Sequence, residues 1–145
     1  MLRSSMPPLM LALCATWWPW PTAATGQTDA DLVAQGEVVF AEACAACHGA
    51  EARGDGPTAA LLTVRVPDLT ELAARNGGAF DPVQVIHTVD GRTGLAAHGG
   101  PMPMFGGLLT GPSAVIDGPD GSPVRTTEPI LAVTRWLETL QGETR

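Results

Sequence analysis

Lysine is absent from this chain of 145 residues, so its eight basic residues are all arginines. Fifteen Asp and Glu residues outweigh them, and the formal net charge is −7. Nucleic acids and anionic membranes attract cationic surfaces, so this balance argues against both as partners. It favours a partner protein that presents a basic docking patch.

Cysteine is scarce as well. Of the three cysteines, only Cys44 and Cys47 lie beyond the first two dozen residues. A secreted domain stabilised by disulfides needs several well-separated pairs, which two cysteines three positions apart do not supply. Another component must therefore complete the core of so small a domain.

The chain also lacks a long apolar run. A membrane-spanning helix needs about 20 apolar residues, and the apolar segments of this chain are shorter. The most apolar segment runs from Leu9 to Trp18, after Arg3, and small residues follow at 22–26. This order predicts a cleaved secretory signal peptide over residues 1–24. An uncleaved anchor is the alternative, and membrane contact is expected only in that case.

Four stretches carry apolar residues at helical spacing. The first begins after Thr28, a good N-cap residue, with Asp31 three positions later as in a capping box. Residues 114–116 and 123–125 flank a Gly-rich turn and predict a small β-hairpin, with an irregular loop as the alternative. Helices are predicted over residues 29–45, 68–75, 82–90 and 128–141.

The strongest local motif is the segment Cys44-Ala45-Ala46-Cys47-His48. Two thiols at this spacing can each form a thioether to one edge of a haem, and the adjacent imidazole can then reach the iron. The Cys-x-x-Cys-His pattern is typical of c-type haem attachment. A thioredoxin-like redox pair would follow a strand, whereas a helix is predicted here. A zinc site would need a fourth ligand, for which His87 and His98 are the usual candidates.

With these residues the chain resembles the class I monohaem c-type cytochromes of bacteria, over roughly residues 31–140. The resemblance implies an all-α fold of three to five helices around one covalent haem c, in a cytochrome c domain over residues 25–145. It also implies a periplasmic location, or the periplasmic side of the inner membrane if the anchor is kept. The segments that carry it are 44–49, 53–57, 67–69, 102–106 and 136–137.

The resemblance assigns His48 as the proximal iron ligand and a methionine of the later loop as the distal one. Pro101 and Pro103 bracket Met102 and restrict its backbone, which lowers the entropy lost on ligation. Residues two apart in an extended segment point to the same side, so Met102 and Met104 are expected to face alike. The family pattern places the ligand before the proline, which selects Met102 and leaves Met104 as the alternative.

The resemblance further implies that a backbone carbonyl near Pro67 orients His48. Haem propionates need cationic or hydrogen-bonding partners, and Arg53 is preferred over Arg65 and Arg92 for this role. The chain has no tyrosine, so a phenolic anchor for the propionates is excluded.

These residues predict an electron carrier that passes single electrons between redox proteins and is not an enzyme. Ligation by His48 and Met102 would leave no open position on the iron. Two alternatives remain. One is a haem enzyme or gas sensor with a labile sixth ligand, and the other is the electron-accepting subunit of a dehydrogenase complex.

Overall fold

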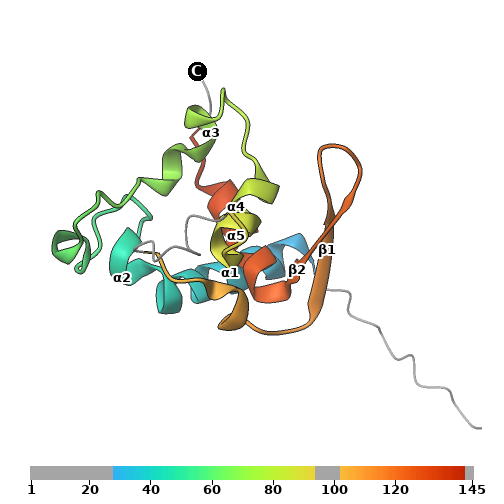
Figure 1. Ribbon diagram of the computed structural model, residues 1–145, viewed down its shortest axis with the longest axis horizontal. Coiled ribbons are helices and arrows are strands. Elements are labelled where there is room, and N and C mark those ends of the chain that lie inside the picture. The colour runs from blue at the N-terminus through green and yellow to red at the C-terminus, as the bar shows by residue number, and fades with distance from the viewer. Residues whose placement is uncertain (1–27, 94–101, 143–145) are drawn as a thin grey trace, which may run out of the picture.

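The computed structural model describes residues 28–93 and 102–142. The predicted signal segment and His98 therefore lie outside the described residues. The helices of this part pack around a crossing of the first and last, and a two-stranded hairpin precedes the last helix (Figure 1). In chain order the elements are α1 (Asp29–Ala43), α2 (Ala45–His48), η1 (Ala59–Leu61), η2 (Leu69–Glu71), α3 (Leu72–Arg75), α4 (Pro82–Asp90), η3 (Phe105–Gly107), β1 (Ser113–Asp117), β2 (Pro123–Thr127) and α5 (Glu128–Thr139).

Helix α1 begins where the sequence predicts. The backbone N–H of Asp31 donates to Thr28 Oγ1 at 3.2 Å, and the N–H of Thr28 donates to Asp31 Oδ2 at 3.0 Å, so the capping box is complete. The helix ends two residues earlier than predicted. Cys44, at φ −119°, forms a turn before the short helix α2.

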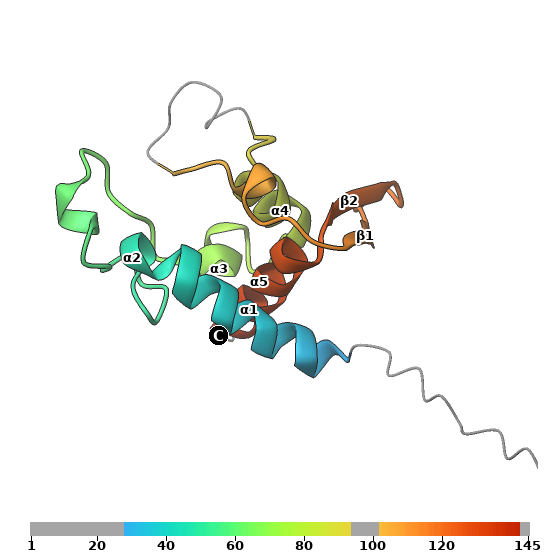
Figure 2. The ribbon, with the colours of Figure 1, turned by 90° about the horizontal axis from the view of Figure 1, so that it is seen from below.

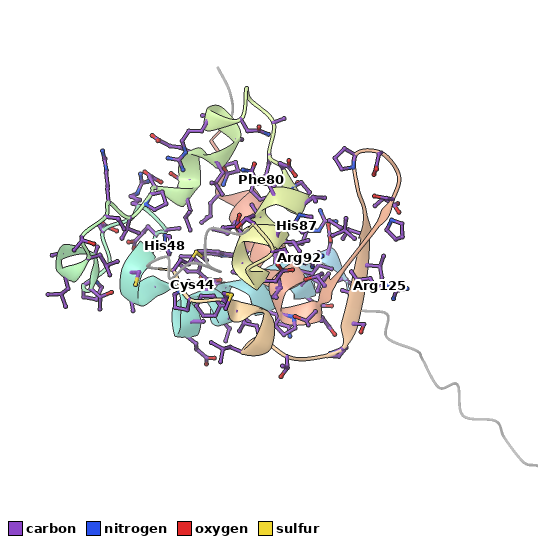
Figure 3. All side chains as sticks on the ribbon, viewed as in Figure 1. Cys44, His48, Phe80, His87, Arg92 and Arg125 are labelled. Carbon is purple, nitrogen blue, oxygen red and sulfur yellow. The ribbon has the colours of Figure 1, made fainter. Side chains whose placement is uncertain are left out.

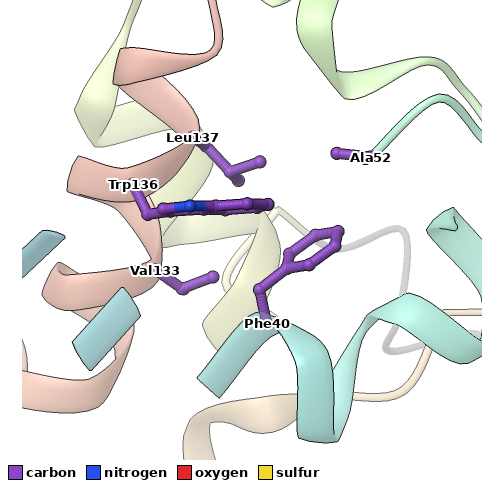
Figure 4. Close-up of a cluster of buried hydrophobic side chains, with 5 residues drawn as sticks. All are labelled: Phe40, Ala52, Val133, Trp136 and Leu137. Carbon is purple, nitrogen blue, oxygen red and sulfur yellow. The ribbon is translucent and has the colours of Figure 1, made fainter. Parts of the chain in front are cut away.

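Helices α1 and α5 cross at Gly36. A Cβ at this position would lie 2.0 Å from the carbonyl oxygen of Ala132 and 2.8 Å from Trp136 Cβ, so only glycine permits the approach. One turn further along α1, the ring of Phe40 lies with its centroid 4.5 Å from that of Trp136. The first core cluster lies at this crossing. It contains Phe40, Ala52, Val133, Trp136 and Leu137 (Figure 4).

Helix α4 has the bounds that the sequence predicts. Asp81 caps its start by accepting from the backbone N–H of Gln84, proline occupies the first turn, and Gly91 ends it in the left-handed conformation. Its buried residues join a second core cluster beside the α1–α5 crossing. That cluster contains Ile86, Val89, Phe105, Val124 and Ile130.

The β-hairpin predicted as one of two alternatives is present. Its strands pair antiparallel, with Ser113 opposite Thr127 and Asp117 opposite Pro123. The hairpin extends from one end of the helical body (Figure 2). Ile116 and Val124 face the second core cluster and attach the hairpin to the helices. The predicted all-α fold of three to five helices is confirmed, since the described residues form five α-helices with the small hairpin before the last one.

Among residues 28–93 and 102–142, no helix combines the length and the apolar character needed to cross a membrane.

Candidate functional site

The Cys-x-x-Cys-His motif occupies the junction of α1 and α2. The backbone N–H of Cys44 still bonds to Phe40 O, at 2.8 Å, and so belongs to the last turn of α1. Its own carbonyl then accepts from Cys47 N at 3.1 Å and from His48 N at 3.0 Å. The tight turn therefore fixes the three motif side chains relative to one another through the backbone alone.

The loop after the motif folds back against α2. The N–H of Gly54 donates to His48 O at 2.7 Å, and the N–H of Gly56 donates to Cys47 O at 3.1 Å. A Cβ on Gly56 would lie 2.5 Å from Ala46 O, which explains why glycine stands there. These bonds satisfy carbonyls at the end of a helix and so hold the motif in place.

Both cysteines, His48 and Met102 line one cavity of about 450 Å³, within the range of small-molecule sites. Its other walls are mostly apolar and include Val66 and Phe105. An adjoining hollow of about 340 Å³ shares His48 and Met102. Figure 3 labels Cys44 and His48, which come from the junction of α1 and α2. The structure thus brings together four residues that are up to 58 positions apart in sequence.

The thiol of Cys44 is unsuited to redox exchange. Burial, and secondly the neighbouring Cys47, raise its pKa to about 11. A thioredoxin-like pair needs a thiolate at neutral pH, which requires a lowered pKa. The segment before the motif is also helical rather than a strand, so the redox-pair alternative is disfavoured. Within the described parts of the chain, no three His, Cys, Asp or Glu residues gather as a metal site.

His48 is buried, and its Nδ1 has no hydrogen-bond partner. Burial lowers the pKa of His48, and the carbonyl of Pro67 acts in the opposite direction to a smaller extent. Pro67 lies on the wall of the same cavity, but the bond from Nδ1 to its carbonyl is not closed in the structure. A neutral imidazole beside a carbonyl acceptor is the arrangement that metal-ligating histidines use.

The two methionines do not face alike, so the expectation of a common direction is wrong. Met102 lies on the cavity wall and packs against the second core cluster. Met104 is 53% exposed, and its side chain lies over Gly91. The reason is that the extended segment is short, since Met104 already caps the 3₁₀ turn η3. The placement favours Met102 as the ligand.

The arginines also separate. Both Arg53 and Arg65 are exposed, but Arg65 lines the cavity and Arg53 lines another hollow, beside Glu51 and Glu71. Arg92 is bound to Asp90 and to the backbone of Arg125. Of the three arginines considered for the propionates, Arg65 is the one that lines the cavity.

One residue of the site has no sequence signal. The hydroxyl of Thr58 donates to Ala46 O at 2.6 Å and lies 3.1 Å from Cys47 Sγ. It follows Cys47 by eleven positions, in a loop whose path only the fold reveals. Sequence patterns could not have selected it among the chain's other threonines.

The family model for cytochrome c matches residues 33–112, which is more than half of the chain. The chain belongs to the cytochrome c family. Comparison with curated proteins gives no match. Membership in the family makes this chain a haem-binding electron-transfer protein, and the haem type that the family implies is haem c.

The residues present fit such a group. The cavity is apolar, as a porphyrin requires, and it carries two thiols, one imidazole and one thioether on its walls. The imidazole has a buried nitrogen without a partner, next to the Pro67 carbonyl. The family match ends at residue 112, so the hairpin and α5 lie beyond it.

Proposed function

We propose that this cytochrome is an exported periplasmic electron carrier with a single covalent haem c, and that it is not an enzyme. The observation that carries the proposal is the convergence of Cys44, Cys47, His48 and Met102 on one apolar cavity. The imidazole of His48 and the thioether of Met102 come from distant segments and line the same cavity as the two thiols, so they would suit a haem iron held by both residues.

Each residue has a separate task in this proposal. Cys44 and Cys47 hold the cofactor through thioethers, with the backbone of α2 fixing their spacing. His48 supplies the proximal nitrogen, and Pro67 O orients its ring once the bond to Nδ1 closes. Met102 supplies the distal sulfur. When bound, the haem iron supplies one-electron redox chemistry at a potential that Met/His ligation raises.

The cavity walls give the chain's own contribution to electron transfer. Val66 and Phe105 exclude water, so little solvent rearranges when the charge on the site changes. A rigid pair of ligands has the same effect, because no bond has to form or break. Arg65 is the cation placed to neutralise a propionate at the cavity wall.

The proposed partner is a redox protein with a basic docking patch. After removal of residues 1–24, the domain would keep seven arginines against fifteen acidic residues. The proposed location in the periplasm rests on the signal-like order of those first residues. A retained anchor would instead place the same domain at the periplasmic side of the inner membrane.

The ferric absorption spectrum tests the proposed ligands. A protein co-expressed with a c-type maturation system is expected to show a Soret band and a near-red band from methionine sulfur to iron. It should bind cyanide and carbon monoxide slowly. A spectrum without the near-red band, together with rapid ligand binding, would instead identify a haem enzyme or gas sensor.

Affinity capture from the periplasm tests the carrier role. A carrier is expected to purify alone and to be reduced by more than one soluble donor. Stable co-purification with one dehydrogenase would make it a subunit of that complex instead.

A further inference from the structure

Arg92 joins the end of α4 to strand β2 of the hairpin. Its Nε donates to Asp90 Oδ2 at 2.5 Å, and its backbone N–H donates to Asp90 Oδ1 at 3.0 Å. Its second guanidinium nitrogen donates to the carbonyl oxygen of Arg125 in β2, also at 2.5 Å. Figure 3 labels both arginines where the end of α4 meets the hairpin. One side chain thus ties a helix end to a strand 33 residues later.

Asp90 is the buried member of this group. Its side chain is 8% exposed, against 44% for Arg92, with which it forms an ion pair. Loss of this partner would leave a buried carboxylate unpaired and would strongly destabilise the folded state. The ion pair is therefore expected to persist. Arginine suits the position because its planar fork serves the carboxylate and a second acceptor together.

The segment that follows Met102 rests on the same helix end. A Cβ on Gly106 would lie 2.7 Å from Asp90 O and 3.2 Å from Asp90 Cβ, so η3 approaches α4 as closely as a glycine permits. A Cβ on Gly91 would lie 2.7 Å from Met104 Cγ. The segment from Met104 to Gly106 therefore packs against Asp90 and Gly91, next to Arg92.

The hairpin completes the attachment. Val124 of β2, Phe105 of η3 and the side chain of Met102 belong to, or pack against, the second core cluster. The bond from Arg92 to the β2 backbone lies beside this cluster and holds the hairpin against α4. The hairpin lies beyond the residues that the family model matches.

We propose that Arg92 is a positioning residue for the distal ligand: with Asp90 and the β2 backbone it holds η3, and through it the sulfur of Met102, in place. Its side chain does not line the cavity. This inference rests on the proposed function, because it takes Met102 to be the ligand. It assigns the hairpin a task, which is to brace the distal side of the site.

The test titrates ferric holoproteins with imidazole and monitors the loss of the near-red band. Arg92→Ala is expected to bind imidazole about tenfold more tightly, since loss of a charge-assisted hydrogen bond of this kind is typically worth that factor. Its near-red band should also disappear at lower denaturant than its helical circular dichroism. Arg92→Lys keeps the charge but not the fork, and an intermediate affinity is expected.

Two controls separate positioning from charge and from general stability. Arg125→Ala removes an exposed positive charge from the hairpin but keeps the carbonyl that Arg92 uses. Val133→Ala lowers global stability by leaving a cavity in the first core cluster, to which Arg92 does not belong. Both are expected to keep the wild-type imidazole affinity.

The outcomes are distinct. Equal imidazole affinity in wild type and Arg92→Ala, or an equal gain in Val133→Ala, would overturn the positioning role. If Arg92→Ala does not fold, the imidazole affinity of Arg92→Lys is compared with that of wild type. A higher affinity supports the positioning role, and an equal affinity overturns it. A wild-type protein with haem but no near-red band would refute Met102 ligation itself, and with it the inference.

Discussion

The two sides of the cavity are built by different means. On the His48 side, the motif is held by backbone hydrogen bonds between residues close in sequence, and α1 is fixed by its direct contact with α5 at Gly36. On the Met102 side, the side chains of Asp90 and Arg92 join α4 to β2, and η3 packs on the end of α4 at Gly106. The motif itself is therefore held by local backbone bonds, whereas the surroundings of Met102 depend on side-chain contacts between segments distant in sequence.

The comparison predicts that damage to the helix crossing affects the whole domain. Gly36→Val places carbons against the Ala132 carbonyl, which cannot move without displacing α5. We expect a loss of at least about 3 kcal/mol in the free energy of unfolding, because overpacking against backbone is not relieved by a side-chain rotation. Chemical denaturation of the holoprotein measures it. Val38→Ala, at an exposed position of α1, is the control, and similar losses in both would contradict the account.

On the other side, damage is expected to stay local. Met102→Ala should abolish the near-red band and raise the apparent affinity for cyanide by about tenfold or more, because the open iron is no longer a minor state. The free energy of unfolding of the polypeptide should change much less than in Gly36→Val. Met104→Ala is the matched control, since this side chain does not line the cavity. A lost band in Met104→Ala with a retained one in Met102→Ala would reverse the assignment.

Gln141 is an exception on the His48 side, because its side chain bonds to residues that are distant in sequence. Its amide nitrogen donates to Leu69 O at 2.9 Å, and its amide oxygen accepts from Ala73 N at 2.9 Å. Gln141→Ala should cost about 1–2 kcal/mol of unfolding free energy. Thermal unfolding followed by circular dichroism measures this, with the exposed Gln84→Ala as control. Equal melting temperatures for the two variants would show that the link contributes nothing.

The smallest effect is expected at the start of α1. Thr28→Ala removes the cap but no tertiary contact, and should cost about 1 kcal/mol. Because this end of α1 lies far in sequence from the motif, the ligation bands should not change. A Soret or near-red shift in Thr28→Ala would show that the two ends of α1 are coupled, contrary to the local character inferred for this side.

The sequence predicts best the features that depend on neighbouring residues. The bounds of α4 follow from Asp81, proline at the first turn and Gly91, and the start of α1 follows from Thr28 and Asp31. Tertiary packing decides the rest. The break at Cys44, for example, separates α2 from α1 although the apolar pattern continues across it.

The site shows the same limit. The attachment motif is local and was found directly, whereas the direction of Met104 depends on η3, and the place of Arg65 depends on a loop without regular structure. Arg92 carries no pattern that distinguishes it from Arg53. Only its contacts with Asp90 and β2 reveal its task.

The central claim is that the protein carries one haem covalently on Cys44 and Cys47. Its most direct test is the intact mass, under denaturing conditions, of protein exported from cells that contain the c-type maturation machinery. We predict the mass of the processed polypeptide plus one haem, and that of the bare polypeptide for the Cys44→Ala, Cys47→Ala double variant. A wild-type protein with the bare mass would contradict the claim.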